Sequence, residues 1–173
     1  MKKLLLTLTF LGLTSAYINA ASTFTASVNI ENPIVLTETT ALSFGTIIPG
    51  DVGNTVIAIN SSNFSPAVIS GSGSVSGGFL GVIDIATNIE SAQTVNISIT
   101  GSSYLTNSVG GQLGINNWIV LGETRVRPSL VYGSSITIVV SFNNQIAVGA
   151  VLTVPAKAST GVYTGSYNIN ASY

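Results

Sequence analysis

The chain has 173 residues, a formal net charge of −1, and charged side chains at only 6% of its positions, far below the roughly 25% of ordinary soluble domains. It contains no Cys and no His, which excludes disulfides, cysteine nucleophiles, Cys/His zinc sites and a Ser-His-Asp triad. With five Lys and Arg in all, it lacks the clustered positive charge that binding to nucleic acids or anionic membranes requires.

The first 20 residues have the features of a secretory signal peptide. A basic start at residues 2–3 is followed by an apolar run over residues 4–13, which is shorter than the ~20 residues of a membrane-spanning helix. Small and polar residues follow, and we expect cleavage between Ala20 and Ala21. Removing 20 of the 173 residues leaves 153, with three basic and six acidic side chains and a net charge of −3. We expect export to the periplasm and then to the cell surface, a fimbria or the extracellular space.

The rest of the chain consists of short β-prone runs separated by Gly, Ser, Asn and Pro, without an amphipathic helix. The first run, residues 23–31, alternates apolar and polar side chains and puts Phe24, Ala26, Val28 and Ile30 on one face. Further strands are predicted over residues 34–36, 42–48, 55–59, 67–70, 79–86, 94–100, 118–121, 126–132, 136–142, 151–154 and 161–173. The Gly/Ser-rich stretch between Ser70 and Phe79 is predicted to be a mobile loop.

The last run, GVYTGSYNINASY, is predicted to be a strand from residue 161 to the last residue. Its apolar face contains Tyr163, Tyr167, Ile169, Ala171 and Tyr173. Many short strands at spacings of about 8 to 15 residues favour an antiparallel sandwich or barrel.

Four stretches together resemble a known family. They are PIVLT at 33–37, LSFGTIIPG at 42–50, VGAVLTV at 148–154 and GVYTGSY at 161–167. The sequence resembles a bacterial family of exported, pilin-like domains of unknown function, and is more distantly similar to spore coat protein U and the archaic chaperone–usher pilins. The resemblance implies an all-β, immunoglobulin-like antiparallel β-sandwich that lacks its last strand.

The resemblance also implies a structural subunit of a surface appendage or coat that assembles by β-strand addition. Residues 21–31 would be an N-terminal extension whose face of Phe24, Ala26, Val28 and Ile30 is donated to another subunit. Residues 32–173 would form the sandwich, with the terminal strand beside the acceptor site. The partners implied are copies of the chain or related subunits, a periplasmic chaperone and an outer-membrane usher. Alternation alone leaves a second interpretation open, in which residues 23–31 are the domain's own first strand.

No catalytic, metal or cofactor site is predicted. Asp51, Asp84 and Glu90 are too scattered to read as a pair of catalytic carboxylates, so we expect no enzyme activity. Arg125 and Arg127 share one face of a predicted strand and form a weak surface ligand candidate for a carboxylate or sugar acid. The alternative is that they lie on a solvated strand edge.

Two other functions remain open from the sequence. A monomeric secreted sandwich that acts as an adhesin or glycan-binding module would have the same composition. A small outer-membrane barrel would also have a signal and alternating strands. The strand runs are mostly shorter than the ~9–11 residues of a spanning strand, and aromatic residues make up only 8% of the chain, which favours the other two.

Overall fold

The computed structural model describes residues 27–28, 33–60, 64–87, 92–122, 131–140 and 143–173. The chain divides into two units, residues 1–30 and 31–173. The described part of the first unit is Ser27 and Val28, which lie outside any strand, and Val28 is 81% exposed. The second unit is built from antiparallel β-strands and has no helix in its described ranges, so the predicted all-β, sandwich-like fold class is confirmed.

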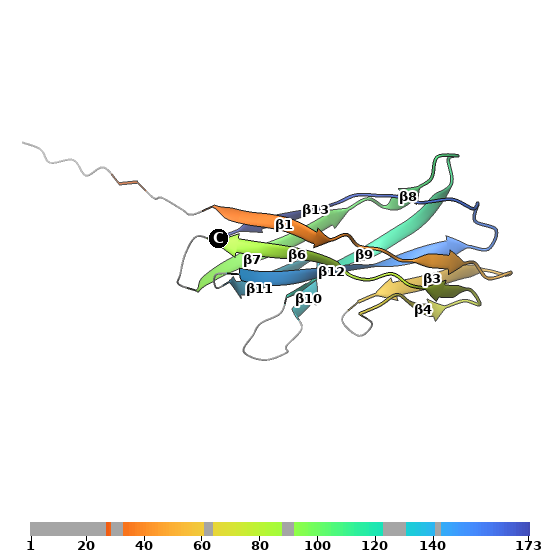
Figure 1. Cartoon of the computed structure of the whole chain (residues 1–173), viewed down its shortest axis with the longest axis horizontal. Coiled ribbons are helices and arrows are strands. Elements are labelled where there is room, and N and C mark those ends of the chain that lie inside the picture. Colours follow the sequence, from red (N-terminus) through yellow and green to blue (C-terminus); the bar gives the residue numbers. More distant parts are fainter. Residues whose placement is uncertain (1–26, 29–32, 61–63, 88–91, 123–130, 141–142) are drawn as a thin grey trace, which may run out of the picture. The chain divides into compact units, whose positions relative to one another are not determined.

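Thirteen strands are described, and most of them are labelled in Figure 1. In chain order they are β1 (Ile34–Thr40), β2 (Thr46–Ile48), β3 (Asn54–Ile59), β4 (Ala67–Ser70), β5 (Ser74–Ser76), β6 (Gly81–Thr87), β7 (Gln93–Gly101), β8 (Tyr104–Thr106), β9 (Gln112–Gly122), β10 (Val131–Gly133), β11 (Ser135–Val140), β12 (Asn143–Pro155) and β13 (Tyr167–Ser172).

The large sheet is organised around β12. Strand β9 runs along one edge of β12, from the pair Ile146–Gly122 to the pair Thr153–Gly114. The other edge of β12 is shared, because β6 pairs with its first half and β3 with its second half. Strand β1 pairs with β6, β4 pairs with β3, and β10 and β8 pair with the two ends of β9.

A three-stranded sheet, β11–β7–β13, covers the half of the large sheet that contains β1 and β6. Alternate residues of β7 and β11 point inward and are buried, as the period of two predicted. With residues of β6, β9 and β12 they form the first cluster: Ile83, Ile85, Val95, Ile97, Ile99, Val120, Ile136, Ile138, Val140, Ile146 and Val148. Partly buried side chains of β1 and β13 also pack against this cluster. This half of the domain is a two-layered sandwich.

The other half of the large sheet carries the second cluster: Phe44, Ile57, Ile59, Leu113, Ile115, Ala150, Leu152 and Val154. The elements that pack over this cluster differ from the three-stranded sheet that packs over the first cluster. The two-stranded sheet β2–β5 contributes Ile47 and Val75, and the irregular segment 158–165 contributes Ala158 and Tyr163. Among the described residues, no continuous sheet covers this cluster.

A bulge in β9 lies between the two clusters. Residues 116 and 119 pair with Val151 and Gly149, so β9 has one residue more than β12 at this point. Asn117 adopts the left-handed conformation with φ of 47° that such a bulge requires. The bulge shifts the alternation of β9 and leaves Trp118 in contact with both clusters.

Several predicted strands are longer in the structure than the sequence suggested. Strand β12 begins at Asn143 rather than 151, and β9 begins at Gln112 rather than 118. Ile146, Val148, Ala150, Leu152 and Val154 alternate through β12 and are all buried. Glycines at 149 and 114 made these runs resemble loops, yet both are paired within the sheet.

The predicted terminal strand was wrong in its first half. Residues 161–166 have the alternating pattern but are not a strand, and β13 starts at Tyr167. Gly161 has φ of 148°, and only Thr164 forms an isolated bridge, with Thr106. The segment crosses the second cluster instead of continuing the three-stranded sheet. The strand also ends one residue before the predicted end, because β13 ends at Ser172, and Tyr173 is 39% exposed.

The prediction of a loop from Ser70 to Phe79 was also wrong in part. Residues 74–76 form β5, which pairs with β2 through Val75 and Ile47. Val75 packs against the second cluster, and this one apolar side chain within a Gly/Ser-rich stretch explains why the segment is ordered against the domain.

Candidate functional site

Several strands have an unpaired edge in the part of the chain that the structure describes, and two of them, β1 and β13, lie at the end of their sheets beside the first cluster. Strand β1 pairs with β6 on one side, and β13 pairs with β7 on one side. Neither has a ladder on its other edge within the described ranges. The two strands lie in different sheets, and the side chains of Glu38 on β1 and Tyr167 on β13 meet between them. We call the boundary between these two edges the seam.

The core-facing residues of both strands are those of the predicted pattern. Tyr167, Ile169 and Ala171 of β13 and Ile34 and Leu36 of β1 pack against the first cluster. The residues between them on β13, Asn168, Asn170 and Ser172, are exposed. The terminal strand is therefore held by its apolar face and by one ladder, and its second backbone edge is available.

One side-chain hydrogen bond crosses the seam. The hydroxyl of Tyr167 donates to Oε1 of Glu38 over 2.5 Å. Burial, together with this hydrogen bond and the negative charge of Glu38, raises the pKa of Tyr167 well above its usual range. The tyrosine ring also packs on Trp118, with the ring centroids 5.5 Å apart.

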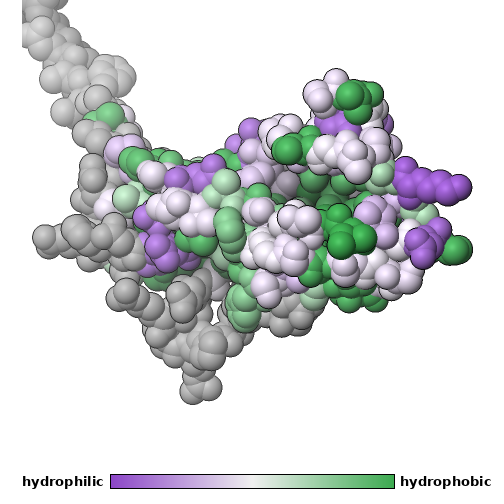
Figure 2. Space-filling model, turned by 45° about the vertical axis from the view of Figure 1, so that its right-hand side comes forward, coloured by the Kyte–Doolittle hydropathy of each residue, from purple (hydrophilic) through white to green (hydrophobic). Residues whose placement is uncertain are grey.

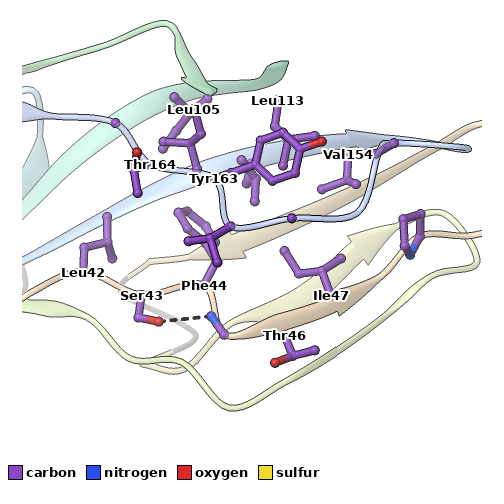
Figure 3. A pocket seen from close by; sticks show the side chains of 18 of the residues that line it. Leu42, Ser43, Phe44, Thr46, Ile47, Leu105, Leu113, Val154, Tyr163 and Thr164 are labelled. Carbon is purple, nitrogen blue, oxygen red and sulfur yellow. Dashed lines mark hydrogen bonds between the residues drawn. The ribbon is translucent and has the colours of Figure 1, made fainter. Parts of the chain in front are cut away.

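A groove of about 630 Å³ continues from the seam over the second cluster. One wall is the segment 42–49, and the other is the segment 158–167. Figure 3 looks into this groove, with Leu42, Phe44 and Ile47 on one side and Leu113 and Tyr163 on the other. Its floor consists of apolar side chains of the large sheet: Leu113, Ile115, Leu152 and Val154.

The two walls of the groove are each anchored away from it. Segment 42–49 pairs outward with β5 and, through Ser43, with Phe79. Segment 158–167 pairs outward through the bridge of Thr164 with Thr106. No ladder joins the two walls to each other, although both are fully described. The groove is thus a gap in the second layer, bounded by the segment that contains β2 and by the irregular segment that precedes β13.

Tyr163 is fixed in the second wall by a small polar network. Its hydroxyl donates to the carbonyl of Ser159 over 2.7 Å and lies 2.7 Å from the Ser159 hydroxyl. Asn107 donates to that hydroxyl over 3.1 Å and accepts from the backbone N–H of Gly111 over 2.6 Å. Tyr163 was predicted to belong to the terminal strand; instead it helps to form the groove, which alternation could not reveal.

Several predicted site residues lie outside the described residues. These are the cleavage site Ala20 and Ala21, the face residues Phe24, Ala26 and Ile30, and the candidate pair Arg125 and Arg127. Val28 is described and exposed.

Two acidic groups of the described ranges, Glu38 and Asp84, have separate structural partners. Glu38 is bonded to Tyr167, and Asp84 accepts from Gln145 over 2.8 Å. No group of acidic residues in these ranges is arranged to hold a metal ion. The search of the same ranges for a helix able to span a membrane was negative.

Hydrophobic side chains also reach the surface away from the groove. Figure 2 shows them in separate patches among weakly polar and hydrophilic residues. Examples are Ile48 at 66%, Phe79 at 52% and Val162 at 82% exposure. None of these three side chains belongs to either core cluster.

Raising the pH should destabilise the fold through Tyr167. Its pKa is higher in the folded chain than the ~10 of unfolded tyrosine, so its stabilising contribution is complete below about pH 10 and declines above it. Urea unfolding followed by the fluorescence of Trp118 between about pH 8 and about pH 11 measures this slope. Tyr167→Phe should flatten the slope, and Tyr104→Phe, at an exposed tyrosine, should not. Equal slopes in wild type and Tyr167→Phe would contradict the assignment.

A comparison with known protein families identifies a family for this chain. Residues 34–173, which include every described strand, match the family described as Domain of unknown function (DUF4402). No curated protein matches the chain.

Proposed function

This chain belongs to the family Domain of unknown function (DUF4402), which assigns it no activity, and we propose that it is a structural subunit of a bacterial surface appendage or coat that assembles by β-strand addition. The observation that carries the proposal is the incomplete second layer. An apolar groove lies between the segments 42–49 and 158–167, which are not paired with each other. The finer likeness to pilins and spore coat protein U is part of this proposal.

An extended peptide is the occupant that suits this groove best. Its backbone would pair with the free edges of the two flanking segments, and alternate side chains would enter the apolar floor. Each backbone hydrogen bond contributes about 1 kcal/mol net. A buried Phe, Val or Ile side chain contributes roughly 1.5–3 kcal/mol.

The segment 21–31 of another copy is the proposed donor. Its face of Phe24, Ala26, Val28 and Ile30 is apolar, and its single charge, Glu31, lies at the end. A segment of this kind enters an apolar groove without burying an unpaired charge. The alternative, in which the segment completes its own domain, predicts a monomer.

Deleting residues 21–31 tests the proposal. We expect the chain from residue 21 to form linear assemblies, seen by size exclusion and electron microscopy, whereas the deletion variant stays a folded monomer. The variant should bind a synthetic 21–31 peptide and should reject a peptide with Phe24→Ser, Val28→Ser and Ile30→Ser. Assembly that survives the deletion would refute donation by this segment, and so would a full chain that stays monomeric at every concentration.

A second candidate function is favoured by the outer face of the three-stranded sheet. Nine outward side chains of β7, β11 and β13 are hydroxyls or amides without charge: Thr94, Asn96, Ser98, Thr100, Ser135, Thr137, Asn168, Asn170 and Ser172. Such a face suits a neutral glycan, whose hydroxyls need both donors and acceptors. A monomeric full chain in the experiment above would favour this glycan-binding module.

A further inference from the structure

Glu38 occupies a position on β1 where an apolar residue is expected. Ile34 and Leu36 pack against the first cluster, and side chains two residues apart on a strand project to the same face. The residue paired with Glu38 is Ile83, which is 4% exposed. By this alternation Glu38 continues the core-facing row of an edge strand, at the point where the register of β1 becomes irregular, and its side chain is exposed at the rim of the core. The carboxylate can therefore reach a partner at the surface of the domain without being buried.

The partner comes from the other sheet. Tyr167 is the first core-facing residue of β13, and its hydroxyl donates to Glu38 over 2.5 Å. The described parts of β1 and β13 share no backbone ladder, so this bond joins two edges that nothing else in the hydrogen-bond pattern of those strands connects. Hydrogen bonds to an ionised acceptor are stronger than neutral ones.

Packing contacts with neighbouring residues hold the ring of Tyr167 in place. It packs on Trp118 at a centroid distance of 5.5 Å. The indole N–H of Trp118 donates to the carbonyl of Ser102 over 3.2 Å, and its ring fills the space where Gly101 has no side chain. A Cβ at Gly81 would lie 3.1 Å from the Tyr167 hydroxyl. The contacts with Trp118 and Gly81 therefore fix the position of the Tyr167 hydroxyl.

The bond crosses the seam between the exposed side chain of Glu38 and the half-buried side chain of Tyr167. Tyr167 also lines the groove, so the bond stands where the groove meets the seam. A strand added between two others requires about 4.7–4.9 Å on each side, and its alternate side chains project toward the core. Beside the Tyr167–Glu38 bond, the side chains of the added strand would enter the space that these two side chains occupy.

We propose that the hydrogen bond between Tyr167 and Glu38 is a latch, which holds the edges of β1 and β13 together in the free chain and has to open before an added strand can run from the groove along the seam. The second part of this inference rests on the proposed function, and the first part does not.

Hydrogen exchange tests the first part on the chain from residue 21, at concentrations where it is monomeric. Tyr167→Phe removes only the donor, and the amides of β13 should then exchange about tenfold faster, as expected for loss of a hydrogen bond to a charged group. Glu38→Gln keeps a neutral acceptor and should give a smaller increase. Tyr104→Phe is the matched control, and the amides of β3 are the internal reference. Unchanged exchange in β13, or equal acceleration of β3 and β13, would overturn the latch.

Peptide uptake tests the second part. The variant lacking residues 21–31 retains every described strand and both clusters, and it is mixed with a fluorescent 21–31 peptide. Tyr167→Phe in this background should take up the peptide about tenfold faster than the parent. Equal rates would overturn the gating role even if exchange in β13 is faster. Failure of every variant to bind the peptide would refute strand addition itself, and hydrogen exchange would still decide whether the bond holds the seam.

Discussion

Replacing Ile47 by Glu should weaken strand addition at least about 100-fold, whereas the same replacement at Ile48 should leave it unchanged. Ile47 lines the groove and packs against the second cluster. Ile48, the next residue of β2, points to the opposite face and is 66% exposed. The two variants have the same composition and charge, so only the direction of the side chain differs.

The size of this effect follows from what happens to the new carboxylate. Ile47 is half-buried in the free chain, so the added charge keeps part of its hydration there. An entering strand would remove the remaining water and leave the charge without a partner, which costs several kcal/mol. Binding of the fluorescent 21–31 peptide by each variant measures the difference, and circular dichroism checks that both fold. Equal peptide affinity of the two variants would show that the groove is not the acceptor.

Replacing Gly149 by Ala should lower the free energy of unfolding by about 1–3 kcal/mol, toward the upper end of that range. Gly149 lies in β12 between the half paired with β6 and the half paired with β3. A Cβ there would collide with the backbone carbonyl of Ile59, where β3 ends. A backbone atom within a ladder cannot turn aside as a side chain can, so the end of β3 would have to move.

Gly114→Ala is the matched control for this prediction. Gly114 lies in β9, also paired with β12, and an added Cβ would have as its only close neighbour the Cβ of Thr153 at 3.9 Å. We expect its stability to stay within about 0.5 kcal/mol of wild type. Urea unfolding monitored through Trp118 compares the two variants. Similar losses for both would mean that a general preference against Ala in these strands, and not the contact with Ile59, determines the cost.

Apolar or alternating runs without an internal glycine were predictable with nearly correct bounds. Residues 94–100 became β7, and residues 67–70 and 55–59 became β4 and β3 with at most one residue of difference. In β7, a period of two places Val95, Ile97 and Ile99 inward whatever the rest of the chain does. The errors arose where glycine interrupts a strand, as at Gly149, or where alternating residues are not in a sheet, as at 161–166.

The candidate site was predictable only in part. The apolar face of Tyr167, Ile169 and Ala171 follows from the sequence, and the structure places it against the first cluster. Glu38 carries no signal in the sequence, because an isolated acid in a β-prone run is typical of a solvent-facing residue, and Glu38 is indeed exposed. Its contact with Tyr167 joins positions 129 residues apart, and no local pattern carries that information. The same holds for the groove, whose walls come from segments 42–49 and 158–167.

The sequence by itself determined the all-β class, the inward and outward faces of most strands and the absence of thiol and imidazole chemistry, because these depend on composition and on neighbours along the chain. The tertiary structure decided which strand edges pair, which stay open, and where the second layer is left incomplete. Backbone pairing is the same for every residue type, so an unpaired edge leaves no signature in the side chains of its strand. The seam, its Glu38–Tyr167 bond and the adjoining groove therefore follow only from the tertiary structure, which brings Glu38 of β1 to Tyr167 of β13.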